Sequence, residues 1–229
     1  IEPVVASQSD LNQKLTVALA SGTGPHILDQ DISFYSAYYD KGVLEPINLE
    51  PFCAESQAEI EDQYIGTVLE GVSFDGDIYG LPYQTNSMSF FLSADAFEEV
   101  GLDPIADAPK TWDDLKKVGE MLKVVDGGST IRKGYDFPYQ SQRWQLQAFQ
   151  PMVEQFGDTL LSEDKTECRL NSEAAVNALT LWSEVTAVTG DPTVSLATPS
   201  HPNQDLIDGR VAIWMTGPSA TNQRNASQT

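Results

Sequence analysis

The chain of 229 residues carries 34 acidic side chains against 13 basic ones, which gives a formal net charge of -21. A surface of this charge repels phosphate backbones, so the composition argues against nucleic acid as a partner. The length is enough for one large domain or for two lobes that each bury a core, and no stretch approaches the roughly 20 apolar residues of a membrane helix.

The first part of the chain predicts alternating strands and helices. We expect a strand over residues 1–6, a helix over 11–20 that ends at the glycines and proline of 22–25, a strand over 26–29 and a helix over 32–41. This alternation is the pattern of parallel strand pairing. In open α/β sheets, ligands lie where strands end and helices begin.

An acidic helix is expected from about residue 55 to 70, as a solvated outer face. A turn over 74–77 then leads into a strand over 78–82, and Pro82 forces an extended exit. The apolar run 88–92 is short enough for a buried strand.

The rest of the chain shows clear helix signals, including Thr111 with Asp114 three residues later, which predicts a capping box. Ser172 is a second candidate N-cap. The expected helices cover 94–100, 112–124, 144–156, 173–188 and 203–208. The expected strands cover 129–135 and 211–215, with a hairpin around 163–165.

Catalytic motifs are weak in this sequence. Its two histidines, His26 and His201, lie in no recognisable nucleophile, metal or phosphate motif. The many carboxylates would permit a glycosidase pair, but any acidic protein offers such pairs by chance.

Aromatic and planar polar side chains recur at the predicted strand ends. This mixture suits a sugar, whose apolar face packs on rings and whose hydroxyls need polar partners. The candidate ligand-binding residues are Asp29, Asp31, Phe34, Tyr35, Tyr83, Gln84, Asn86, Trp144, Gly217 and Ser219. The alternatives are helix capping by Asp31, packing by Phe34 and core burial of Trp144. Trp182 and Trp214 are expected in the core.

Several stretches carry a family resemblance. The order YGLPY (79–83), an apolar strand, AFEEVGLDP (96–104) and PKTWDDL (109–115) resembles the extracellular solute-binding proteins of ABC importers. Among these proteins, the chain is similar to the family that binds sugars and oligosaccharides and includes maltose-binding protein. Further matches in the same order are LASGTGPHI (19–27), YYDKGVLEPI (38–47), FGDTLL (156–161) with NSEAA (171–175), and DGRVAIWMTGP (208–218).

The resemblance implies an α/β fold of the two-lobe periplasmic-binding-protein type (type II), with a mainly parallel sheet flanked by helices in each lobe. Residues 1–87 would form part of lobe I, 88–93 the hinge or crossing strand, and 94–229 lobe II. The family has segments before Ile1 and after Thr229, including a return to lobe I, so we expect the chain to be incomplete at both ends. Cys53 and Cys168 would lie in different lobes as separate thiols.

The implied function is capture of a carbohydrate, in particular an oligosaccharide, by lobe closure and its delivery to a membrane permease. The resemblance implies a monomeric periplasmic or extracellular protein, with or without a lipid anchor, that uses no cofactor or metal and is not an enzyme. A binding protein for a polyamine or other cationic solute is one alternative. An extracellular carbohydrate-active enzyme is another.

The sequence departs from the family pattern at three places. His26 replaces a common Asp, Leu92-Ser93 replaces a tyrosine-asparagine pair, and Ser219 stands where maltose-binding protein has a stacking Trp. The last change removes one stacking platform. We therefore expect a ligand that is smaller, differently placed or more polar.

Overall fold

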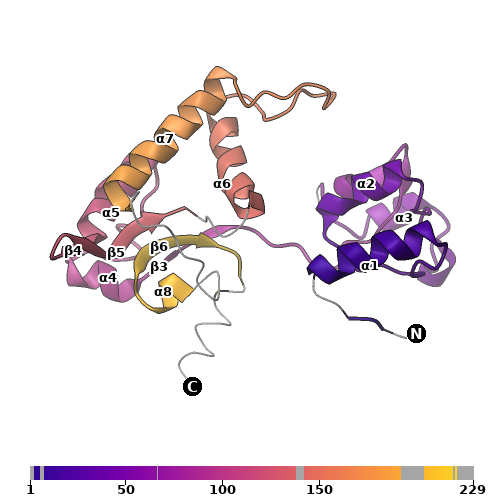
Figure 1. Ribbon diagram of the computed structural model, residues 1–229, viewed down its shortest axis with the longest axis horizontal. Coiled ribbons are helices and arrows are strands. Elements are labelled where there is room, and N and C mark those ends of the chain that lie inside the picture. Colours follow the sequence, from indigo (N-terminus) through magenta and orange to yellow (C-terminus); the bar gives the residue numbers. More distant parts are fainter. Residues whose placement is uncertain are drawn as a thin grey trace. The chain divides into compact units, whose positions relative to one another are not determined.

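The computed structural model describes residues 3–5, 8–65, 67–137, 142–191, 204–218 and 220. The chain divides into two compact units, Ile1–Thr85 and Asn86–Thr229 (Figure 1). None of the helices in these ranges is long and apolar enough to cross a membrane.

The first unit is built from short elements around a small core. Its core residues are Ile60, Leu69, Val72 and Ile78, with Tyr35, Ile47, Leu49, Ala54, Tyr64 and Leu81 packed against them. The elements are α1 (Gln8–Ala20), η1 (Ile32–Phe34), α2 (Tyr35–Asp40), η2 (Glu50–Phe52), α3 (Gln57–Glu61), η3 (Glu70–Val72), β1 (Ser73–Phe74) and β2 (Asp77–Ile78).

The hairpin of β1 and β2 turns at Asp75 and Gly76, which both have positive φ. Two such residues suit the tight hairpin turns that match strand twist. Gln57 fixes α3 to this hairpin, because its amide donates to Asp77 (2.6 Å) and accepts from the Ile78 N–H (2.9 Å).

Several predictions for this unit are wrong. Residues 26–29 and 3–5 are not strands, and the remaining positions of the strand expected over 1–6 lie outside the described residues. The helix expected over 55–70 is reduced to α3, after which the chain turns. Of the residues in α3, Ile60 is the one that is buried, so a longer helix would gain little packing. The strand expected over 78–82 ends at Ile78.

The second unit contains a four-stranded sheet in the order β3-β6-β5-β4. The strands are β3 (Ser89–Leu92), β4 (Val124–Asp126), β5 (Ser129–Asp136) and β6 (Val211–Thr216). β5 and β6 are parallel, whereas β3 pairs with β6 and β4 pairs with β5 in antiparallel fashion. The expected α/β architecture is present, but the sheet is mixed rather than mainly parallel. The local sequence predicts most of these strands, but it does not indicate which strands pair with each other.

The helices of the second unit begin at the predicted residue or within two residues of it. They are α4 (Ala94–Glu99), α5 (Trp112–Leu122), α6 (Gln142–Gln155), α7 (Glu173–Thr189) and α8 (Gln204–Ile207). The capping box of Thr111 and Asp114 is confirmed at α5, and Ser172 caps α7. α5 and α7 lie side by side and pack on β5 (Figure 1).

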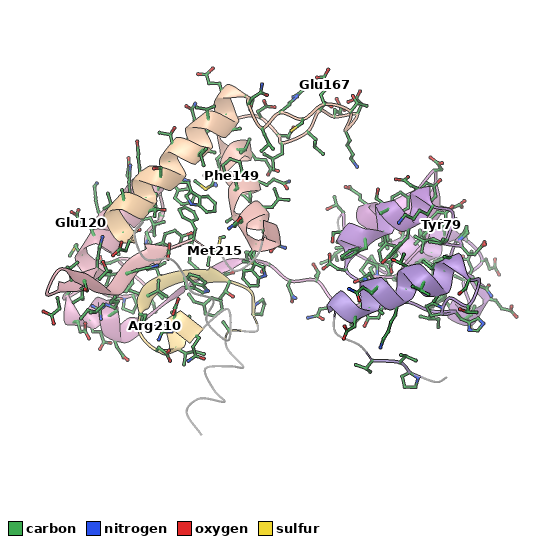
Figure 2. The ribbon with its side chains drawn as sticks, in the orientation of Figure 1. Tyr79, Glu120, Phe149, Glu167, Arg210 and Met215 are labelled. Atoms are coloured by element: carbon green, nitrogen blue, oxygen red, sulfur yellow. The ribbon has the colours of Figure 1, made fainter. Side chains whose placement is uncertain are left out.

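An aromatic cluster fills the space between β5 and the helices. Phe137, just after β5, stacks on Trp182 of α7 with ring centroids 3.7 Å apart. Phe149 of α6 contacts the Trp182 ring edge-on. Figure 2 shows Phe149 on the side of α6 that faces α7. Trp214 is 1% exposed, and Trp182 packs against the core. Both tryptophans therefore have the core role that was predicted for them.

Candidate functional site

Three of the predicted site residues lie together in the first unit. The Tyr83 hydroxyl donates to both carboxylate oxygens of Asp29, at 3.2 and 3.0 Å. Burial raises the pKa of Tyr35, and the negative charge of Asp29 adds to this rise. The structure thus joins the loop before η1, the start of α2 and the segment after Pro82.

Gly80 belongs to the same cluster. A β-carbon at Gly80 would lie 2.5 Å from the Cε1 atom of Tyr35, so the glycine backbone lies directly against this ring. Gly80 was not among the predicted site residues. A glycine close after a strand signals a close approach of another group, and that signal is present in the stretch 79–83.

The two tyrosines of this cluster have different surroundings. Tyr35 is half-buried against the core of the unit, which fixes its ring. Tyr83 is 79% exposed, and its hydrogen bond to Asp29 raises its pKa. An exposed ring beside a carboxylate is a suitable surface for a sugar, because the ring packs on C–H groups and the carboxylate accepts from hydroxyls.

Asp31 and Phe34 have local structural roles. Asp31 accepts hydrogen bonds from the N–H (3.0 Å) and the hydroxyl (2.6 Å) of Ser33, so it caps η1 as the alternative interpretation predicted. Phe34 stacks on Tyr38 at 6.3 Å. Contact with a ligand remains a prediction for both residues.

Gln84, the last candidate residue of the first unit, is exposed in the extended segment after Pro82. In the second unit, Asn86 is exposed and Trp144 is half-buried in the first turn of α6. Gly217 follows β6, and a β-carbon there would meet none of the described residues within 4 Å other than its chain neighbours. Ser219 lies outside the described residues.

A buried ion pair at the end of β5 was not predicted. Lys133 donates to the Asp136 carboxylate, which also accepts from the Phe137 N–H at 3.0 Å. Burial raises the pKa of Asp136, and the charge of Lys133 opposes this rise. The ion pair therefore fixes the conformation of the chain at the end of β5. Its sequence signal is a lysine, Lys133, inside a predicted strand and an aspartate, Asp136, directly after that strand.

A second tyrosine–aspartate pair lies in the first unit, and neither of its members is a predicted site residue. The Tyr39 hydroxyl donates to Asp75 at 2.6 Å, and this bond is the main reason that the pKa of Tyr39 rises to about 12. Tyr39 also stacks on Phe74 at 4.5 Å. This pair therefore fastens α2 to the β1–β2 hairpin.

Neither a metal-binding cluster nor a disulfide occurs in the part of the chain that the structure describes. No group of three or more His, Cys, Asp or Glu side chains that could hold a metal ion occurs there. Cys53 and Cys168 are separate free thiols, as predicted, and both are exposed.

The whole chain matches a known protein family. The family of bacterial extracellular solute-binding proteins matches residues 1–228. The chain belongs to this family. Among its relatives is the arabinooligosaccharide-binding protein of Bacillus subtilis, which is 26% identical over 128 residues, covering 56% of this chain and 28% of the relative. The maltotriose-binding protein of Pyrococcus abyssi is 23% identical over 120 residues, which are 52% of this chain and 24% of the relative.

Solved structures of this family share the fold. An ABC transporter solute-binding protein from Thermotoga lettingae, solved with bound α-D-tagatose, superposes with a TM-score of 0.76 at 23% identity. The sugar-binding protein MalE from Xanthomonas citri superposes with a TM-score of 0.74 at 21% identity. They cover 95% and 98% of this chain, which spans 54% of each of them. The likeness establishes the two-lobe α/β fold class.

Proposed function

We propose that this solute-binding protein captures a carbohydrate, in particular an oligosaccharide, and delivers it to the permease of an ABC importer. The observation that carries the proposal is the cluster of Asp29, Tyr35 and Tyr83, which combines ring faces with a hydrogen-bond acceptor on the surface of the first unit. Named relatives that bind arabinooligosaccharides and maltotriose support the same ligand class.

Capture would proceed by closure of two lobes, residues 1–87 and 94–229, about a hinge at 88–93. The ligand would contact both lobes, and it would favour the closed form by the additional contacts that it makes there. Asp29 and Tyr83 would supply contacts from the first lobe. Trp144, Gly217 and Ser219 would supply contacts from the second. No bond is made or broken in this cycle.

We infer that this event takes place outside the cytoplasmic membrane, which the description of the family as extracellular supports. We infer a monomer, periplasmic or extracellular, with or without a lipid anchor at the cell surface. The closed form would then dock on the permease, which a separate ATPase drives.

Thermal unfolding with a panel of saccharides and amines tests this function. A ligand that binds the folded state stabilises it, by about 2.7 kcal/mol at one hundred times its dissociation constant. We expect an oligosaccharide to raise the melting temperature, whereas spermidine and putrescine do not. A rise with amines alone would reject the carbohydrate proposal.

The residues are tested by calorimetry with the best saccharide from that panel. Tyr83→Ala and Trp144→Ala should each weaken binding by about tenfold or more, because each removes a stacking ring. Phe74→Ala is the matched control, since Phe74 is an aromatic residue of the first unit that stacks on Tyr39 and is not a predicted site residue. Unchanged affinity in either variant would remove that residue from the site.

A further inference from the structure

The charge around Asp29 bears on which saccharides the site accepts. Tyr83 offers one hydroxyl to a carboxylate that has about four acceptor positions, so Asp29 keeps acceptor capacity for a ligand. Both side chains are exposed. A ligand that packs on the Tyr83 ring would therefore lie next to a negative charge.

The rest of the first unit supplies little positive charge. Residues 1–85 contain fourteen aspartates and glutamates but two basic residues, Lys14 and Lys41. Both lysines are exposed, Lys14 on α1 and Lys41 at the C-terminal end of α2. Asp31, two residues beyond Asp29, adds a further carboxylate to the same loop.

An anionic sugar needs positively charged partners, and the first unit has few of them. A carboxylate that leaves water must be paired with a cation or with several donors, because an uncompensated charge is costly to desolvate. Near Asp29 it would meet a like charge instead. A neutral sugar has no such penalty, and its hydroxyls can donate to Asp29.

We propose that Asp29, held by Tyr83, makes the site select uncharged or amino-bearing saccharides and reject those that carry a carboxylate. This inference rests on the proposed carbohydrate function and narrows it to a charge class. Asp29 is then a specificity-determining residue as well as a hydrogen-bond acceptor.

The test compares matched neutral and acidic sugars by calorimetry at low salt. Two pairs are fixed in advance: galactotriose with trigalacturonate, and mannotriose with the trisaccharide of mannuronate. A third pair is any neutral saccharide that binds in the thermal panel, together with its uronate form. We expect the wild-type protein to bind the neutral member at least tenfold more tightly. Added NaCl should narrow this difference, because salt screens repulsion between charges.

Two charge-neutralising variants separate a local effect from the effect of net charge. Asp29→Asn should reduce the neutral-to-acid affinity ratio by about tenfold, whereas Asp75→Asn should leave the ratio unchanged. Asp75 is a matched control because it belongs to the same unit and also accepts from a tyrosine hydroxyl, that of Tyr39. Circular dichroism of both variants checks that they are folded.

The outcomes distinguish the two proposals. Equal binding of neutral and acidic sugars by the wild-type protein would overturn the charge selection and leave carbohydrate capture standing. An equal change of the ratio in both variants would also overturn the role of Asp29. If no saccharide of either class binds, the carbohydrate function fails, and the selection fails with it. The wild-type comparison decides the matter even if Asp29→Asn does not fold.

Discussion

Gly134 of β5 lies so close to Gly119 of α5 that a β-carbon at position 134 would be 1.7 Å from the Gly119 carbonyl oxygen. The obstacle is backbone, which cannot rotate away as a flexible side chain could. Gly134→Ala should therefore lower the free energy of unfolding by about 3 kcal/mol, the upper range for overpacking. Urea unfolding followed by circular dichroism measures this change.

Gly217→Ala is the control for that experiment. Apart from its chain neighbours, its β-carbon would lie more than 4 Å from every residue that the structure describes, so the expected change is within about 0.5 kcal/mol. If both variants unfold at the same urea concentration as the wild type, the close packing of α5 on β5 is wrong.

The capping box of α5 gives a pH-dependent prediction. The hydrogen bond from Thr111 is the main cause that lowers the pKa of Asp114. A carboxyl whose pKa is lowered by folding stabilises the native state above its unfolded pKa of about 4, and this contribution is lost as pH falls through the folded pKa. Thr111→Ala should cost about 1 kcal/mol at pH 7 and less at pH 3.

Thermal melts of the wild type, Thr111→Ala and Thr111→Ser at pH 7 and pH 3 check this prediction. Serine keeps the hydroxyl, so it should retain most of the stability. A cost for alanine that is the same at both pH values would show that the cap and the carboxyl act independently.

The stack of Trp182 on Phe137 should be important for the second unit. Trp182→Ala removes a ring that packs against the core, and the expected loss is about 3 kcal/mol, together with a weaker near-ultraviolet circular dichroism signal. Trp182→Phe keeps an aromatic partner and should lose less. Equal stability of the alanine and phenylalanine variants would argue against the stack.

Salt should stabilise this protein. With a net charge of -21, the folded chain brings like charges together, and screening reduces their repulsion. We expect the melting temperature to rise by about 2–4 °C, equivalent to about 1 kcal/mol, between 0.05 and 0.5 M NaCl. KCl should act equally if screening is the cause. A melting temperature that falls with both salts would contradict this account.

The Tyr83 hydroxyl can be tested separately from its ring. Tyr83→Phe keeps the stacking surface but releases Asp29, and we expect about tenfold weaker saccharide binding, the cost of one hydrogen bond to a charged group. Tyr39→Phe breaks the corresponding bond to Asp75 and should leave affinity unchanged. Calorimetry with the same saccharide measures both, and equal losses would indicate a general effect on the first unit.

Much of the second unit was predictable from local signals. Thr111 and Ser172 marked the starts of α5 and α7, and apolar runs marked β3 and β6. These signals involve residues close together in the chain, so they can be identified from the sequence. The parallel or antiparallel pairing of β3, β5 and β6 depends on residues far apart in the chain, which local patterns do not report.

The first unit was harder to predict because few of its residues are buried. The acidic stretch after Glu55 has helix-forming composition but little apolar surface to pack, so α3 ends at Glu61. At the candidate site, Asp29, Tyr35 and Tyr83 were predicted separately, and the structure brings them together. Gly80 and the pair of Lys133 with Asp136 were missed, since their roles depend on neighbours in space.

The position of β6 between β3 and β5 has a consequence for biosynthesis. β3 opens the second unit along the chain, yet its hydrogen-bonding partner β6 begins only at Val211, after β4 and β5 have been made. Until that strand emerges, the edges of β3 and β5 are unpaired, and exposed edges of this kind promote association between chains. Nascent second units should therefore depend on chaperones until translation has passed Thr216.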